Sequence, residues 1–286
     1  MSAEFEIIER YFCSNTKLAE SVRLGIGDDA AITSLPAGSE LVTATDALIE
    51  GTHFLPGAPP ESVGHRCLAV NLSDIAAMGA KPLWASLALT MPAADEDWLE
   101  GFAKGFFELA DAASVALIGG DTVRGPLSVV VTVQGMVTTG KGVERGGATP
   151  GDSIYVTGSP GDAAAGRRLL QDVGASMNSL DEAGRVLAKR FYFPEPRLEA
   201  GAALRDIASA MIDISDGLDA DLGRLLAASG CGAAIDLEAL PLSAEIQSYA
   251  GVAGAQELAL LGGEDYELCF TVAADCETQF IIFTTQ

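Results

Sequence analysis

The stretch 126-PLSVVVTVQGMVTT-139 decides the class of fold to which this chain belongs. Val131 and Val133 flank the polar Thr132, and an alternation of apolar and polar residues with a period of two is typical of a strand that is buried on one face. The run carries no charged residue and continues until a cluster of glycines begins. It therefore predicts a long strand inside a sheet.

A turn-rich segment, 140-GKGVERGGATPGD-152, follows this strand and separates it from a second strand pattern, 153-SIYVTG-158. Clusters of glycine, proline and polar residues of this kind mark connections between domains. We therefore expect one domain over residues 1–139 and a second over residues 140–286.

Strand and helix patterns alternate on both sides of this boundary, which favours an α/β or α+β fold. Further strands are expected at 40–46, 83–90, 210–215, 232–237 and 266–272. Helices are expected at 61–77, 95–112, 161–172, 195–209 and 216–229.

The composition limits what the protein can be. The 286 residues are 49% hydrophobic and carry a formal net charge of −23, so the chain can bury a core and is not a disordered acidic tail. A chain this acidic, without a basic stripe, repels nucleic acid. No apolar run approaches the roughly 18 residues of a membrane span, and the N-terminus is charged, so we expect a cytoplasmic protein with no membrane partner.

Aspartates stand at or near the ends of several apolar elements. They are Asp29, Asp46, Asp74, Asp121, Asp213 and Asp216. Two carboxylates ~4 Å apart repel by roughly 4 kcal/mol at an effective dielectric near 20, so converging ones need cations. Carboxylates without histidine or thiolate partners select hard ions such as Mg²⁺, which bind jointly with phosphates. Each aspartate taken alone also suits a turn or a helix N-cap.

Four further residues each have one structural and one functional interpretation. Gly120, in 119-GGDT-122, suits a tight turn or a backbone nest for phosphate. Arg145 suits a solvated surface or a phosphate clamp. His53 and Glu264 suit satisfied core groups or ligand contacts. Because the sequence contains neither a Walker motif nor a Rossmann fingerprint, any nucleotide site is of another kind.

A set of motifs, in this order and spacing, resembles that of thiamine-monophosphate kinases of the PurM-like superfamily. The motifs are GIGDDAA (25–31), TDALIEGTHF (45–54), NLSDIAAMGA (71–80), LIGGDT (117–122), RGGATPGD (145–152), IDISDGL (212–218) and GGEDYELCF (262–270). The resemblance implies an N-terminal sheet domain that pairs into a homodimer and a C-terminal α/β sandwich. It also implies transfer of the γ-phosphoryl group of ATP to thiamine monophosphate, giving thiamine diphosphate.

The resemblance assigns roles to residues of this chain. As magnesium ligands it implies Asp29, Thr45, Asp46, Asp74, Asp121, Asp213 and Asp216. For ATP it implies Gly120, Asp121, Arg145 and Ser215, and for thiamine monophosphate His53 and Glu264. No catalytic base is expected, because the acceptor phosphate, with a second pKa of about 6, is already ionised near neutral pH. Magnesium ions and Arg145 would supply electrostatic catalysis of a direct in-line transfer.

The chain departs from the family pattern in two places. Ala44 stands where the family often has a hydroxyl residue, and the tail 278-TQFIIFTTQ-286 does not resemble the family and ends before its usual terminus. We therefore expect a shortened second domain with weakened thiamine binding, and an aggregation-prone window at residues 280–283.

Two alternatives remain at this point. One is another PurM-like ATP enzyme, such as an aminoimidazole ribotide synthetase, a selenophosphate synthetase or a hydrogenase-maturation protein, although the N-terminal region lacks a reactive cysteine motif. The other is a non-catalytic remnant that binds Mg²⁺ and a nucleotide.

Overall fold

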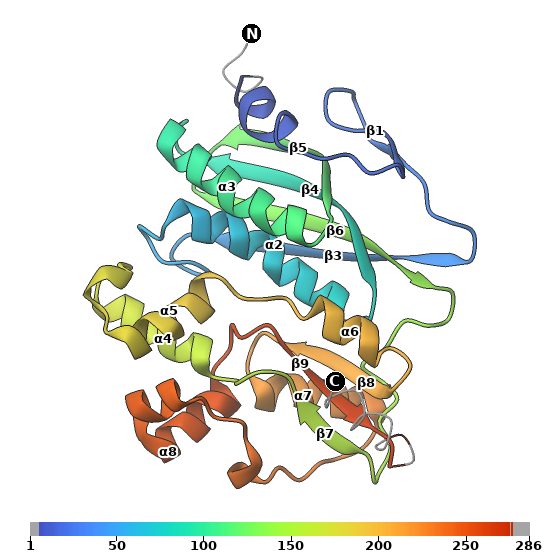
Figure 1. Cartoon of the computed structure of the whole chain (residues 1–286), viewed down its shortest axis with the longest axis vertical. Coiled ribbons are helices and arrows are strands. Elements are labelled where there is room, and N and C mark those ends of the chain that lie inside the picture. The colour runs from blue at the N-terminus through green and yellow to red at the C-terminus, as the bar shows by residue number, and fades with distance from the viewer. Residues whose placement is uncertain (1–5, 275, 277–286) are drawn as a thin grey trace. The chain divides into compact units, whose positions relative to one another are not determined.

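The computed structural model describes residues 6–274 and 276, and these form two compact units (Figure 1). Unit 1 contains the described residues up to Ile75 together with Lys81–Gly140. Unit 2 contains the short segment Ala76–Ala80 and the described residues from Lys141 onward. The tail window at residues 280–283 lies outside the described residues.

Unit 1 is built on a four-stranded sheet with the order β3-β6-β4-β5. The strands are β3 (Ser39–Ile49), β6 (Ser128–Thr138), β4 (Lys81–Met91) and β5 (Ala116–Arg124). β6 pairs antiparallel with β3 and β4, whereas β4 and β5 are parallel. The strands expected at 40–46, 83–90 and 126–139 are confirmed, and β5 was not predicted. Smaller elements are η1 (Ile8–Cys13), β1 (Val22–Leu24) and β2 (Ile32–Thr33).

One face of this sheet is covered by α2 (Pro60–Ala77) and α3 (Glu96–Ala112), as Figure 1 shows. Val131 and Val133 of β6 are fully buried, while the intervening Thr132 is half-buried on the other face. α3 begins where the Asp95 side chain accepts a hydrogen bond from the backbone N–H of Trp98 at 3.1 Å, which is an N-cap. The alternation in the sequence therefore corresponds to two faces of the sheet: the valines lie under the helices, and the polar residue between them lies on the open face.

Unit 2 contains a three-stranded antiparallel sheet with the order β7-β9-β8. Its strands are β7 (Ser153–Val156), β9 (Glu267–Val272) and β8 (Ala208–Ile214). Its helices are α4 (Asp162–Asp172), α5 (Glu182–Tyr192), α6 (Leu198–Leu204), α7 (Leu218–Ser229) and α8 (Ala244–Leu261), with the short η2 (Met177–Ser179) and η3 (Leu237–Ala239). α4, α5 and α8 share a small core that includes Ala165, Leu187 and Ile246.

Two of the predicted elements are wrong or too long. The segment 232–237 contains no strand, and its residues are exposed, because no described strand lies beside it to complete a ladder. The helix expected at 195–209 is only the seven-residue α6, and residues from Ala208 onward belong to β8. None of the described helices combines the length and the apolar character that a membrane span requires.

Candidate functional site

Asp46 of β3 and Asp74 of α2 form a half-buried pair of carboxyl groups. Asp46 lies opposite the buried Val131, so its side chain emerges on the face that α2 covers, and its carboxyl group hydrogen-bonds that of Asp74. Burial raises the pKa of Asp46, while the charge of His53 and the hydrogen bond with Asp74 oppose that rise. A divalent cation is the type of ligand that lets both groups ionise.

Two other predicted site residues lie close to Asp46 in the chain, Thr45 on β3 and His53 in the turn that follows β3. The Nδ1 atom of His53 accepts a hydrogen bond from the backbone N–H of Ile49 at 3.1 Å. In the neutral imidazole the proton therefore lies on Nε2. Thr45 projects from the opposite face of β3, where its hydroxyl lies 2.9 Å from that of Thr132.

A second acidic group lines a cavity of about 890 Å³ in unit 1. Asp28 and Asp29, from the glycine turn after β1, and Asp121, from β5, all contribute to its wall. Each of two carboxylates accepts a hydrogen bond from the next backbone N–H, Asp28 from Asp29 and Asp121 from Thr122, both at 2.8 Å. Gly120 is required beside Asp121, because a Cβ there would lie 1.8 Å from the Leu87 carbonyl oxygen.

The two acidic groups of unit 1 are separate. Asp46 and Asp121 lie on the two edge strands of the sheet, three strand spacings or roughly 14 Å apart. Across the sheet, Asp46 is in register with Leu87 of β4, whereas Asp121 is in register with the next residue, Ala88. Successive residues of a strand point to opposite faces, so the side chains of Asp46 and Asp121 lie on opposite faces of the sheet. Within the described parts of the chain, no three His, Cys, Asp or Glu side chains form a group able to hold a metal ion. The donors are nevertheless all oxygen atoms, the chemistry that Mg²⁺ prefers.

In unit 2, the turn after β8 is fixed by a carboxylate that the sequence did not single out. Asp221 of α7 is 1% exposed, and its Oδ2 accepts hydrogen bonds from the backbone N–H groups of Ser215 and Asp216, both at 2.9 Å. Arg224 bridges the same turn, because its guanidinium pairs with Asp221 and lies 2.6 Å from the carboxylate of Asp216. Asp213 is buried at the end of β8, 5% exposed. Ser215 and Asp216 therefore stand on a rigid turn.

Glu264 lies directly against this turn. Its backbone N–H donates to the carbonyl oxygen of Ser215 at 2.8 Å, and the N–H of Tyr266 donates to that of Ile214 at 2.8 Å. Gly263 has no room for a side chain, because a Cβ there would lie 2.4 Å from the Ser215 oxygen. The structure thus brings together the motifs IDISDGL and GGEDYELCF.

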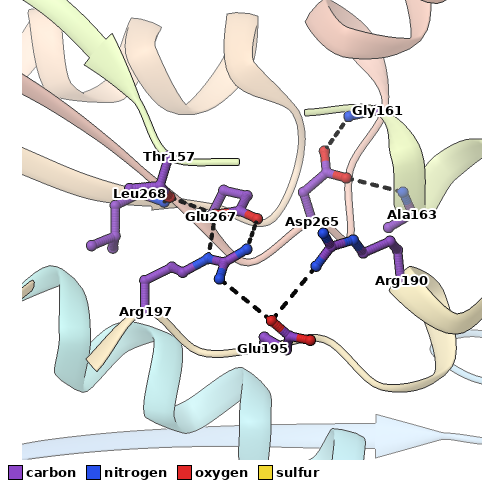
Figure 2. A network of polar contacts seen from close by, with 9 residues as sticks. All are labelled: Thr157, Gly161, Ala163, Arg190, Glu195, Arg197, Asp265, Glu267 and Leu268. Atoms are coloured by element: carbon purple, nitrogen blue, oxygen red, sulfur yellow. Dashed lines mark hydrogen bonds and ion pairs between the residues drawn. The ribbon is translucent and has the colours of Figure 1, made fainter. Parts of the chain in front are cut away.

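Asp265, between Glu264 and Tyr266, is buried and caps α4. Figure 2 shows its carboxylate accepting hydrogen bonds from the backbone N–H groups of Gly161, at 2.7 Å, and Ala163, at 3.1 Å. Burial raises the pKa of Asp265 well above its usual range, although these two bonds oppose the rise. The N-terminus of α4 is therefore already occupied by an acidic side chain of the chain itself.

We expect the stability of the Asp265→Asn variant to respond less to pH than that of the wild type. Because the folded-state pKa is raised, the carboxyl group contributes stability below its unfolded pKa of about 3.9, and this contribution is lost as pH rises through the folded value. Asparagine does not titrate, and it loses one of the two N–H bonds at every pH. Urea midpoints between about pH 4 and pH 8 should show the wild-type advantage shrinking as pH rises. A constant difference would contradict the raised pKa.

Arg145 lies in the loop at the start of the main segment of unit 2. Its carbonyl oxygen accepts a hydrogen bond from the Ser229 hydroxyl at 3.2 Å, and the N–H of Gly147 donates to the same hydroxyl oxygen at 3.2 Å. The backbone is therefore fixed, while the Arg145 side chain is exposed and available to an anion.

Comparisons with known proteins agree on one family. The model of the AIR synthase related protein, N-terminal domain, matches residues 27–137, and that of the corresponding C-terminal domain matches residues 149–282. The chain is 49% identical over 269 residues to the thiamine-monophosphate kinase of Salmonella typhimurium (strain LT2), covering 94% of this chain and 82% of that protein.

Solved structures of similar proteins indicate the same family. The thiamine-monophosphate kinase of Stenotrophomonas maltophilia K279a is similar with a TM-score of 0.92 and 45% identity, covering 99% of this chain and 90% of that one. AaThiL complexed with AMPPCP and TMP is similar with a TM-score of 0.80 and 34% identity, covering 89% and 82%. These relatives confirm the PurM-like fold and the kinase class expected from the motifs. The chain belongs to the thiamine-monophosphate kinase family.

Proposed function

We propose that this chain transfers the γ-phosphoryl group of ATP to the phosphate of thiamine monophosphate, giving thiamine diphosphate and ADP. The observation that carries the proposal is the likeness to AaThiL, a chain with 34% identity whose structure was solved with AMPPCP, a non-hydrolysable ATP analogue, and TMP. The acidic pair Asp46 and Asp74 supports it, because a cation beside two close carboxyl groups favours the ionised form of both.

Oxygen donors in each of the two units would hold magnesium ions, several in all. They are Asp29, Thr45, Asp46, Asp74, Asp121, Asp213 and Asp216. Magnesium bound there supplies neutralisation of the charge on the two phosphate chains, which otherwise repel one another. The protein would determine where these ions bind. The turns at Asp121 and Asp216 are held in place by hydrogen bonds from backbone N–H groups to carboxylates.

The remaining residues bind and orient the two substrates. The residues proposed to contact ATP are Gly120 and Asp121 in unit 1 and Ser215 in unit 2, and the exposed guanidinium of Arg145 would clamp phosphates. The Nε2–H of His53 would donate to the phosphate of thiamine monophosphate, and the carboxylate of Glu264 would face the cationic thiamine group. No base is needed, since the acceptor oxygen is already ionised, so the transfer is direct and in line.

The experiment that tests this function is incubation with Mg-ATP and thiamine monophosphate, followed by separation of the thiamine phosphates. We expect thiamine diphosphate and ADP in equal amounts, no product with EDTA, and none when thiamine replaces its monophosphate. Binding of ATP without formation of thiamine diphosphate would instead identify a non-catalytic nucleotide-binding protein.

We also propose that the open face of the unit 1 sheet pairs with the same face of a second copy. Leu41 and Ile49 are 51% and 46% exposed there, and Thr43 between them is also exposed. Large apolar side chains exposed on one sheet face are typical of an interface.

We expect Leu41→Arg to convert this dimer into a monomer, because a charge placed within an apolar interface must be desolvated. The matched control is Leu237→Arg, since Leu237 is 45% exposed but lies in unit 2. Sedimentation velocity should give a monomer for the first variant and a dimer for the control and the wild type. A dimer for both variants would place the interface elsewhere.

A further inference from the structure

The loop between α8 and β9 holds two residues in an uncommon backbone conformation. Glu264 has φ 75° and Tyr266 has φ 54°, both in the left-handed region that residues other than glycine seldom adopt. Such residues persist only where the surroundings fix them, and they gather at functional sites. Here the buried carboxylate of Asp265, between them, is fixed by the first turn of α4.

The left-handed conformation places two side chains of the loop together. The Tyr266 hydroxyl donates a hydrogen bond to Oε2 of Glu264 at 2.9 Å, although only one residue separates them. Tyr266 is 9% exposed, so its ring is held in place. The other oxygen of the same carboxylate, Oε1, lies 3.9 Å from the guanidinium of Arg167, too far for a hydrogen bond. The tyrosine hydroxyl therefore lies closer to this carboxylate than the Arg167 guanidinium does.

We propose that Tyr266 is a positioning residue for the recognition of thiamine monophosphate, and this inference rests on the proposed function. The backbone bonds to Ser215 and Ile214 place Cα of Glu264, but backbone bonds do not fix the rotatable bonds of its side chain. The hydrogen bond from the Tyr266 hydroxyl fixes the last rotatable bond of the Glu264 side chain. The carboxylate is therefore oriented before the cationic substrate arrives. Preorganisation of this kind raises affinity by lowering the entropy lost on binding.

The test is Tyr266→Phe, which removes the hydroxyl and keeps the buried ring. We expect KM for thiamine monophosphate to rise about tenfold, because a hydrogen bond to a charged group is lost. We expect kcat, KM for ATP and the thermal midpoint to remain close to the wild-type values. A merely structural role for the hydroxyl would instead lower the thermal midpoint and change both KM values. The matched control is Tyr249→Phe, since Tyr249 is 40% exposed on α8.

A double-mutant cycle with Glu264→Ala shows whether Tyr266 acts through Glu264. If it does, Tyr266→Phe has no further effect on KM in the Glu264→Ala background. Equal effects of Tyr266→Phe in both backgrounds, or no effect in an active wild-type background, would overturn the inference. A wild type that forms no thiamine diphosphate would instead overturn the proposed function, and the inference with it.

Discussion

We expect Asp46→Asn to reduce kcat/KM for phosphoryl transfer by roughly 100-fold or more, the effect of removing one electrostatic contact from a phosphoryl or oxyanion site. Asparagine preserves the size of the side chain but removes a negative charge from the pair with Asp74. Measured rates of thiamine diphosphate formation at saturating Mg²⁺ check the result.

The same variant should fold normally. Because burial raises the pKa of Asp46, its charge opposes folding of the metal-free protein at neutral pH, and asparagine carries no such charge. We therefore expect the thermal midpoint without Mg²⁺ to be equal to or above that of the wild type, and the rise on adding Mg²⁺ to be smaller. Asp97→Asn is the matched control, since Asp97 is exposed in the first turn of α3. Wild-type turnover by Asp46→Asn would remove Asp46 from the site.

The second large effect concerns stability. Arg197→Met should lower the free energy of unfolding of unit 2 by about 3–5 kcal/mol, because it leaves the Glu267 carboxylate buried without its cation. The guanidinium holds Glu267 through two hydrogen bonds, at 2.6 and 2.5 Å, and the Thr157 hydroxyl donates a third at 2.5 Å (Figure 2). The Glu267 side chain is 7% exposed, so water cannot replace these bonds.

Urea denaturation monitored by circular dichroism checks this prediction. Lys141→Met is the control, because the Lys141–Asp206 pair is exposed by 57% and 67% and should contribute within about 0.5 kcal/mol. Adding Glu267→Gln to Arg197→Met should recover part of the loss, because the buried charge is removed. A loss below about 1 kcal/mol in the single variant would show that the buried pair contributes little.

The sequence carried enough information for β3, β4 and β6 of the unit 1 sheet and for most helices, though not for β5, because period-two and period-3.6 patterns report which face is buried. It could not indicate α8, whose alanine- and glycine-rich sequence is interrupted by non-helical Gly251. The strand pattern at 232–237 was misleading, because a strand also needs a neighbour.

The acidic motifs of the candidate site could be recognised in the sequence, but the sequence did not show which of their aspartates lie together. Nothing in the sequence placed Asp46 beside Asp74 and apart from Asp121, because that depends on strand order and on which face each residue occupies. Asp221 was missed because an aspartate in the first turn of a helix has an ordinary capping explanation. Tyr266 was missed because a left-handed tyrosine leaves no mark in composition or periodicity.

Single-turnover transfer from ATP labelled at the γ-phosphate tests the central claim most directly. Enzyme, Mg²⁺, labelled ATP and thiamine monophosphate are mixed and quenched in acid, and the label is then located. Direct transfer predicts that the label appears in the terminal phosphate of thiamine diphosphate at the rate at which ADP forms, with none on the protein. Label on the protein, or inorganic phosphate without labelled thiamine diphosphate, would contradict the mechanism.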